Sequence, residues 1–297
     1  QSIELGELLN HHLSAGEGVT VMSRVLESKY RPSRKLLDHT AAMIKAQSDF
    51  VLLDEQRVAF ESVLAEARAG YHEAKKSVVL IQGGPGTGKS VIALHLVGEL
   101  ARMGYNAQHA TGSKAFTENI RRVVGRRVGG SQFRYFNQYG GMDRNAVDVL
   151  ILDEAHRLRS TSASRFTPKA KRTDLAQVDE LIGVAKTSVF FIDDLQGVRP
   201  NEVGDTQLIL EAAERNGAEV SAFELDTQFR LAGSKAFLQW VDGMLGLTPE
   251  SANPTWDPDR ETFDFRIVDS VEQLDALIRS KADEGHSARL TAGFCWR

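Results

Sequence analysis

The chain has 297 residues, of which 42% are hydrophobic and 26% charged, and its formal net charge is −4. This composition is that of an ordinary folded protein and excludes a chain-wide basic surface, so any nucleic-acid binding must come from a local groove. The single cysteine, Cys295, excludes a disulfide framework and a multi-cysteine zinc site, and no apolar run approaches the length of a membrane span.

The N-terminal part begins with residues 1–49, which we predict to be a helical extension because they show amphipathic periodicity. Gln56 follows at the start of the next predicted helix, upstream of the first strand. In many ATP-driven nucleic-acid motors an upstream glutamine contacts the adenine edge, because its amide supplies both a donor and an acceptor. Gln56 is therefore a candidate adenine contact, with an ordinary surface glutamine as the alternative.

A glycine-rich loop lies between the first predicted strand, 77–82, and a predicted helix that begins at 91. It has the spacing G-x-x-x-x-G-K-[ST], in the context of strand, loop and helix that this motif requires. Glycines let the backbone wrap around phosphate oxygens, and the helix adds its positive N-terminal end. Lys89 is expected to contact the β- and γ-phosphates of ATP, and the Ser90 hydroxyl to bind Mg²⁺. The predicted nucleotide-binding residues are Gly83, Gly84, Pro85, Gly86, Thr87, Gly88, Lys89 and Ser90.

Two stretches after this helix are candidates for contact with single-stranded nucleic acid. The polar turn 111–116 follows a second predicted strand, 105–110, and so lies at the carboxyl edge of the sheet, where such folds bind ligands. The second stretch has arginines in 121–127, which can contact phosphates, and aromatic residues in 133–136, on which bases can stack. An ordinary connecting turn and a solvated helix face remain open as the respective alternatives.

An acidic pair, Asp153 and Glu154, ends the third predicted strand, 147–152. Asp153 is expected to hold Mg²⁺, and Glu154 is expected to polarise the attacking water. Because the pair follows a buried strand downstream of the glycine-rich loop, this pattern favours hydrolysis of ATP over a solvated acidic surface.

Two polar stretches follow the acidic pair. Residues 157–173 contain six basic residues and no acidic ones, which indicates either contact with nucleic acid or a solvated insertion. A predicted helix, 174–185, then precedes a fourth strand, 188–192. Gln196 lies in the polar turn after this strand and is either a sensor of the γ-phosphate or a plain turn residue.

The last part of the chain repeats the alternation of helix and strand. After a strand over 222–225, the pattern predicts a helix over 234–245, a strand over 262–268, a helix over 271–281 and a strand over 288–295. A second α/β lobe therefore begins here. The chain starts with Gln1 and ends within a predicted strand, so we expect an excerpt of a longer protein.

Taken in order, these stretches resemble the successive motifs of superfamily I DNA/RNA helicases. The matching parts are Gln56, the glycine-rich loop, 111–116, the Asp-Glu-Ala-His run 153–156, 193–196 and 225–230. Residues 191–196 and 227–230 are most similar to the Schlafen-type helicase-like P-loop family.

This resemblance implies that Glu154 is the catalytic base, that Gln196 senses the γ-phosphate and that Arg230 acts as an arginine finger. It also implies the adenine contact of Gln56 and the phosphate contact of Lys89. The chain departs from the helicase pattern at Ile192, where glycine is usual, and at Ser113, which interrupts the usual Thr-Gly-Lys order.

We therefore predict an α/β protein with a parallel-sheet RecA-like lobe over 50–225 and the start of a second RecA-like lobe over 226–297. The predicted function is cytoplasmic hydrolysis of ATP, with Mg²⁺, coupled to binding of or translocation on single-stranded DNA or RNA. One alternative is an ATP-driven switch that does not translocate. The other is a nucleic-acid-binding regulator whose ATPase is vestigial.

Overall fold

The computed structural model describes residues 52, 54–72, 75–124, 132–163, 167, 172–197, 199–226, 235–247 and 265–290. These residues divide between two compact units, 52–247 in one and 265–290 in the other. The expected helical extension over 1–49 lies outside the described residues, as do Arg230 and Cys295.

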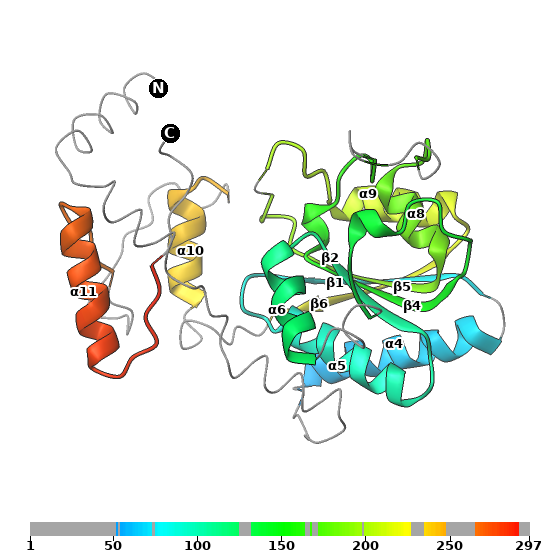
Figure 1. Ribbon diagram of the computed structural model, residues 1–297, viewed down its shortest axis with the longest axis horizontal. Coiled ribbons are helices and arrows are strands. Elements are labelled where there is room, and N and C mark those ends of the chain that lie inside the picture. Colours follow the sequence, from blue (N-terminus) through cyan, green and yellow to red (C-terminus); the bar gives the residue numbers. More distant parts are fainter. Residues whose placement is uncertain are drawn as a thin grey trace. The chain divides into compact units, whose positions relative to one another are not determined.

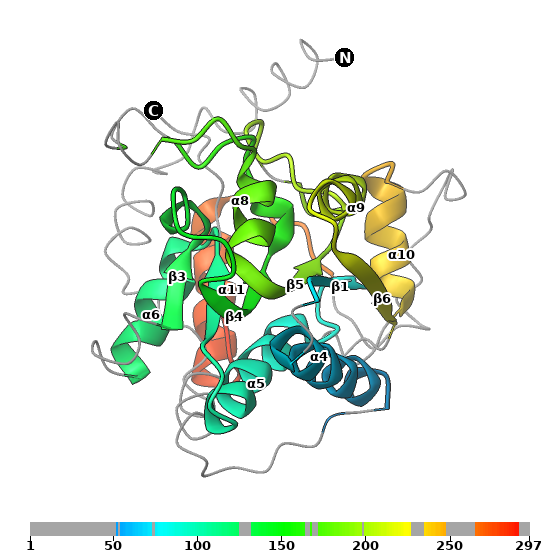
Figure 2. The same ribbon diagram turned by 90° about the vertical axis from the view of Figure 1, so that its right-hand side faces the viewer.

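The larger unit is built on a sheet of parallel strands with helices between them. The strands are β1 Ser77–Gly83, β2 Ala107–Thr111, β3 Phe133–Tyr135, β4 Val147–Asp153, β5 Ala185–Ile192 and β6 Glu219–Leu225. The helices are α4 Asp54–His72, α5 Lys89–Arg102, α6 Lys114–Val124, α8 Gln177–Val184, α9 Thr206–Arg215 and α10 Lys235–Met244, with short 3₁₀ helices η1 Phe136–Gln138 and η2 Ala155–Arg157. The six strands follow the order β3-β2-β4-β5-β1-β6, and all pairs are parallel (Figure 1, Figure 2).

Side chains alternate along the strands between two hydrophobic layers. On β1, Val79 and Ile81 pack in the layer that contains α4, α5 and α6, whereas Val78 and Leu80 pack in the layer that contains α8 and α9. Figure 1 shows α4 and α5 on one side of the sheet and α8 and α9 on the other. A fully buried aliphatic side chain contributes about 1.5–3 kcal/mol, so a sheet covered on both faces favours the near-continuous apolar runs of β1, β4 and β5.

The register of the strands determines which loops share an edge of the sheet. Thr111 at the end of β2 pairs with Asp153 at the end of β4, and Gln82 near the end of β1 pairs with Ile192 at the end of β5. Because all strands run in the same direction, the loops after β1, β2, β4 and β5 emerge at one carboxyl edge. The expected α/β fold with a parallel sheet is confirmed, and this edge carries the candidate site.

Some element boundaries differ from those expected from the sequence. The strand expected over 188–192 already begins at Ala185, directly after α8. Ala185 pairs with Val147 of β4, and Thr187 pairs with Ser77 of β1, whose Oγ donates to Thr187 Oγ1 at 3.1 Å. The short strand β3 was not expected. Residues 265–268 and 288–290, which lie within two expected strands, form no strand, and the remaining parts of both, 262–264 and 291–295, lie outside the described residues.

The smaller unit contributes one described helix, α11 Val271–Asp283. Its first turn is capped by Ser270, whose hydroxyl accepts a hydrogen bond from the N–H of Gln273 at 3.2 Å. This helix confirms the expectation over 271–281 to within two residues. Within the described ranges, every helix is too short or too polar to cross a lipid bilayer.

Candidate functional site

The loop after β1 is shaped by glycines at positions that other residues do not tolerate. Gly86 and Gly88 have φ values of 87° and 89°, in the left-handed region that favours glycine. A Cβ on Gly83 would lie 2.7 Å from Thr87 Oγ1, so this residue must also lack a side chain. Gly88 O then accepts from the N–H groups of Val91 and Ile92, and α5 begins. The positive N-terminal end of a packed helix therefore lies at the loop, as anion binding requires.

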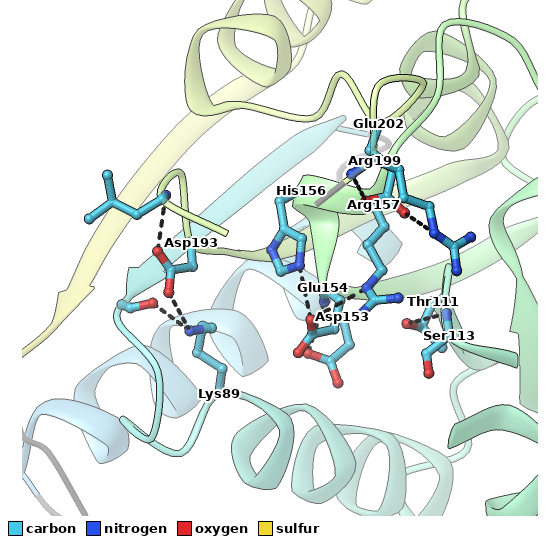
Figure 3. Close-up of polar contacts among 12 residues, drawn as sticks. Lys89, Thr111, Ser113, Asp153, Glu154, His156, Arg157, Asp193, Arg199 and Glu202 are labelled. Carbon is cyan, nitrogen blue, oxygen red and sulfur yellow. Dashed lines mark hydrogen bonds and ion pairs between the residues drawn. The ribbon is translucent and has the colours of Figure 1, made fainter. Parts of the chain in front are cut away.

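Lys89 is only 7% exposed, and its side chain lies within the loop. Its Nζ donates to Gly83 O and, at 2.9 Å, to Gly84 O. The same ammonium lies 3.9 Å from Oδ2 of Asp193, a buried carboxylate oxygen that has no hydrogen-bond partner (Figure 3). Lys89 is thus positioned by loop carbonyls and by one carboxylate from the turn after β5.

Ser90 and Asp153, the two expected Mg²⁺ ligands, are brought together. Asp153 is 2% exposed, and the Ser90 hydroxyl lies close enough to its carboxylate to lower the pKa of Asp153. Burial raises the pKa of Asp153, but His109, Ser90 and Lys89 together hold it below its ordinary value. His109 Nε2 lies 3.6 Å from Asp153 Oδ2 in this buried cluster.

These two side chains fit a magnesium ion. A hydroxyl and an ionised carboxylate are hard oxygen ligands, and Mg²⁺ usually takes one or two protein ligands and completes its shell with phosphates and water. In the part of the chain that the structure describes, no group of three or more histidine, cysteine or acidic side chains forms a fuller metal cage. Ser90 and Asp153 would therefore hold the ion together with the phosphates of a nucleotide.

Glu154 has an unusual backbone conformation and a carboxylate that is already engaged. Its φ and ψ are 58° and 50°, in the left-handed region that costs a residue with a side chain about 1–2 kcal/mol. Its Oε2 lies 3.0 Å from His156 Nε2 and 3.7 Å from Arg157 Nε (Figure 3). The strained turn directs Glu154 away from the line of β4 and places its carboxylate beside Asp153.

The other expected site residues lie in different surroundings. Gln56 is 6% exposed, and its amide nitrogen donates to Thr87 O at 3.0 Å, so it contacts the backbone of the glycine-rich loop. Gln196 is partly exposed in the turn after β5, where its N–H donates to Asp193 O at 3.1 Å. Arg230 lies outside the described residues, so its expected role stays a prediction.

A pocket of about 510 Å³ opens beside β2 and η2; we name it the basic pocket. Four cations and two carboxylates contribute to its walls, together with aromatic and small polar side chains. Its lining residues are Thr111, Gly112, Lys114, Glu118, Arg121, Tyr135, Phe136, Asn137, Arg157, Arg159, Thr161, Ser162, Gln177 and Glu202. The turn 111–116, the start of 157–173 and part of 133–136 thus meet at one place.

Arg121 lies in the stretch that was expected either to contact single-stranded nucleic acid or to form a solvated helix face. Its Nε donates to Phe133 O at 2.8 Å, which connects α6 to β3, and its guanidinium lies 5.2 Å from the centre of the Tyr135 ring. Arg121 is therefore neither fully solvated nor freely presented to a ligand. It stacks on an aromatic ring at the wall of the basic pocket.

Three residues of this edge were missed by the sequence analysis as site residues. Asp193 directly follows β5, and Asp153 is the last residue of β4, so the position of Asp193 at the end of a buried strand was a usable signal. The only signal for His109 in the sequence was its position as a histidine in a strand whose other residues are small or uncharged. Arg157 was noted as one cation of a basic stretch; its spacing of three residues from Glu154 was a usable signal, although the contact also depends on the fold of η2.

Comparison with known proteins identifies a family. Residues 76–297 match the family model described as Schlafen group 3, DNA/RNA helicase domain. No curated protein sequence is significantly similar to the chain.

Similar solved structures include the Pif1 helicase from Candida albicans, with a TM-score of 0.38, 15% identity, and coverage of 80% of this chain and 55% of that one. A DNA replication initiation factor gives a TM-score of 0.33 and 16% identity, with 80% and 64% covered. Domain III of DnaA from Thermotoga maritima gives 0.33 and 15%, with 88% and 95% covered. The chain spans less than two thirds of the length of the first two.

The family match covers more than half of the chain and includes the glycine-rich loop, the Asp-Glu-Ala-His run and the turn after β5. The expected resemblance to helicase-like P-loop ATPases is thereby confirmed. The chain belongs to the Schlafen group 3 DNA/RNA helicase domain family.

Proposed function

We propose that the chain hydrolyses ATP and that single-stranded DNA or RNA controls this hydrolysis. The observation that carries the proposal is the position of the Ser90 hydroxyl, close enough to the buried carboxylate of Asp153 to lower its pKa, with Lys89 beside them and Glu154 directly after Asp153. It brings the end of the glycine-rich loop and the end of β4 to one point. A hydroxyl and a carboxylate from these two places hold the Mg²⁺ of the nucleotide in P-loop NTPases.

The residues of the site divide the proposed reaction between them. Lys89 exchanges its carbonyl partners in the loop for oxygens of the β- and γ-phosphates and neutralises charge there. Mg²⁺, when bound, supplies further positive charge between these phosphates. Glu154 accepts a proton from the attacking water. Gln56 holds the loop through Thr87 and contacts adenine, and Gln196 senses the γ-phosphate.

The basic pocket supports a single-stranded nucleic acid as the partner. Its cations can contact phosphates, and Tyr135 offers a ring on which a base can stack. Its four cations outnumber its two carboxylates, which meets the requirement for a local basic groove in a chain whose net charge is −4. The family to which the chain belongs is described as a DNA/RNA helicase domain, which supports the same partner.

Residues 226–297 belong, in this proposal, to the start of a second RecA-like lobe, and Arg230 acts from there as an arginine finger. The family match continues to residue 297, which supports this assignment.

The test measures phosphate release from ATP by the full-length protein alone, with single-stranded DNA, with single-stranded RNA and with duplex. We expect hydrolysis that depends on Mg²⁺ and that at least one single strand stimulates more than duplex does. Absence of hydrolysis under all four conditions would overturn the enzyme assignment and leave a regulator with a vestigial site. Hydrolysis at one rate under all four conditions would overturn the coupling and leave an ATP-driven switch.

A further inference from the structure

Arg157 lies in the wall of the basic pocket and also next to Glu154. It is one of the residues that line the basic pocket, and its Nε lies 3.7 Å from Oε2 of Glu154 (Figure 3). The Nε is buried and has no hydrogen-bond partner, so only the charge interaction with Glu154 holds it. A guanidinium in this situation can leave the carboxylate without breaking a hydrogen bond at its Nε.

The backbone that carries Arg157 is fixed from both sides. A Cβ on Gly112 would lie 2.8 Å from Arg157 Cβ, so the stem of Arg157 packs directly on the turn after β2. On the other side, a Cβ on Gly204 would lie 2.0 Å from Ala155 O, and Val203 N donates to Leu158 O at 2.7 Å. Because η2 is held between these two segments, the guanidinium is the part of Arg157 that can move.

The charges around the guanidinium favour an exchange of partners. Arg157 shares the basic pocket with Lys114, Arg121 and Arg159, which raise the local positive potential, and with the carboxylates of Glu118 and Glu202. A phosphodiester that enters this potential offers a guanidinium two oxygens at once, a geometry that an arginine fork matches well. Glu154 offers the guanidinium of Arg157 an ion pair in which Oε2 lies 3.7 Å from Nε, and this Nε makes no hydrogen bond.

Glu154 is held by Arg157 and His156 through the same carboxylate oxygen, Oε2. An oxygen that faces an imidazole and a guanidinium is poorly placed to accept a proton from water. Departure of Arg157 removes one of these two restraints and lets the carboxylate turn about its own side-chain bonds.

We propose that Arg157 is a positioning residue that couples the basic pocket to Glu154. Without nucleic acid it pairs with Glu154 and restrains the base; a phosphate of a single strand in the pocket draws the guanidinium away, and Glu154 then reaches the attacking water. This inference rests on the proposed function, because it requires both ATP hydrolysis and a single strand in the pocket. A ligand shifts such an equilibrium only by its preference for one state, and the phosphate supplies that preference by binding the displaced guanidinium.

The experiment compares Arg157→Gln with the parent protein, using ATP turnover alone and with a saturating single-stranded oligonucleotide. We expect unstimulated turnover to rise about two- to fivefold, which is the effect of losing a partly exposed ion pair. The ratio of stimulated to unstimulated turnover should fall towards one, while the KM for ATP stays the same. The matched control is Arg215→Gln, which removes an arginine paired with Asp179 at 3.0 Å outside the basic pocket and should leave both turnover values unchanged.

Several outcomes would overturn the coupling. One is an Arg157→Gln variant whose unstimulated turnover and stimulation ratio equal those of the parent. Another is a proportional loss of both turnover values at an unchanged thermal midpoint, since Arg157 would then support Glu154 instead of restraining it. If Arg157→Gln lowers the thermal midpoint, the Arg157→Lys variant is measured instead. We expect its ratio of stimulated to unstimulated turnover to fall, because lysine lacks the planar fork of arginine. An unchanged ratio would overturn the proposal.

The parent protein separates this inference from the proposed function. A parent that does not hydrolyse ATP overturns both. A parent that hydrolyses ATP without stimulation by single strands overturns the coupling and leaves the ATPase intact.

Discussion

The glycine-rich loop and the basic pocket lie at the same edge of the sheet, yet the chain builds them differently. The glycine-rich loop is one contiguous stretch that presents backbone groups, and two glycines with positive φ shape it. The basic pocket collects side chains from segments between β2 and the loop before α9. A contiguous backbone site depends on each of its few essential residues, whereas a pocket with four cations retains three after a single substitution. We therefore expect large effects of substitution at the first region and small effects at the second.

Lys89→Ala should cause the largest loss, about 10²- to 10³-fold in ATP turnover, because its ammonium neutralises charge that develops on the phosphates. Turnover and the thermal midpoint are measured together. Lys186→Ala is the control, since it removes a lysine paired with Asp148 at 2.7 Å near the start of β5. Parental turnover in Lys89→Ala would contradict the assignment of the loop.

Glu154→Gln should bind ATP with Mg²⁺ but reduce turnover about 10²-fold, because the amide keeps the shape of the side chain and loses the proton acceptor. Nucleotide affinity and turnover are compared on the same preparation. Equal losses in both would show that Glu154 has a structural role at the end of β4.

Gly204→Ala tests the segment that joins the two regions. The new Cβ would lie 2.0 Å from Ala155 O and 2.9 Å from His156 Cα, so η2 or the segment before α9 must shift. Such overpacking costs about 1–3 kcal/mol, and each kcal/mol lowers the thermal midpoint of a unit of this size by about 2–4 °C. Gly183→Ala in α8 is the matched control, because its Cβ meets nothing within 4 Å. Equal midpoints for the two variants would show that the close approach is not maintained in solution.

Gln56→Ala should weaken ATP binding about fivefold, which corresponds to about 1 kcal/mol for a buried side-chain hydrogen bond. If Gln56 also contacts adenine, as expected from the sequence, GTP binding should weaken less, because guanine does not offer the amide the same donor and acceptor. Displacement of a fluorescent nucleotide gives both affinities. Equal losses would limit Gln56 to its observed contact with Thr87 O.

Lys114→Ala should have the smallest effect, because its side chain is 81% exposed and lies 3.7 Å from Glu118. We expect the affinity for a single strand to fall about two- to threefold and the slope of log affinity against log salt to decrease by about one. Titration of a labelled oligonucleotide at several salt concentrations measures both. If Lys114→Ala lost as much ATP turnover as Lys89→Ala, the expected contrast between the glycine-rich loop and the basic pocket would be contradicted.

The contiguous features of the molecule could be predicted from the sequence. The apolar runs of β1 and β4, the glycine positions of the loop and the rule that parallel strands end at one edge together indicated that Ser90 and Asp153 would meet. The early start of β5 could not be predicted, because Ala185 to Thr187 lack an apolar run and are held by pairing with distant strands, as Thr187 is with Ser77. Arg157 lies only three residues after Glu154, but their contact depends on the turn η2 and on the left-handed backbone of Glu154, which the sequence did not predict.

The left-handed backbone at Glu154 has a consequence for protein engineering. Asparagine and glycine adopt a φ of 58° more readily than glutamate does, so either replacement relieves strain at this turn. A library selected for heat resistance alone would therefore enrich substitutions at position 154 and discard the carboxylate. Stabilised variants of this chain should be selected with a turnover assay in parallel, because thermal stability and the proposed catalytic role of Glu154 favour different amino acids.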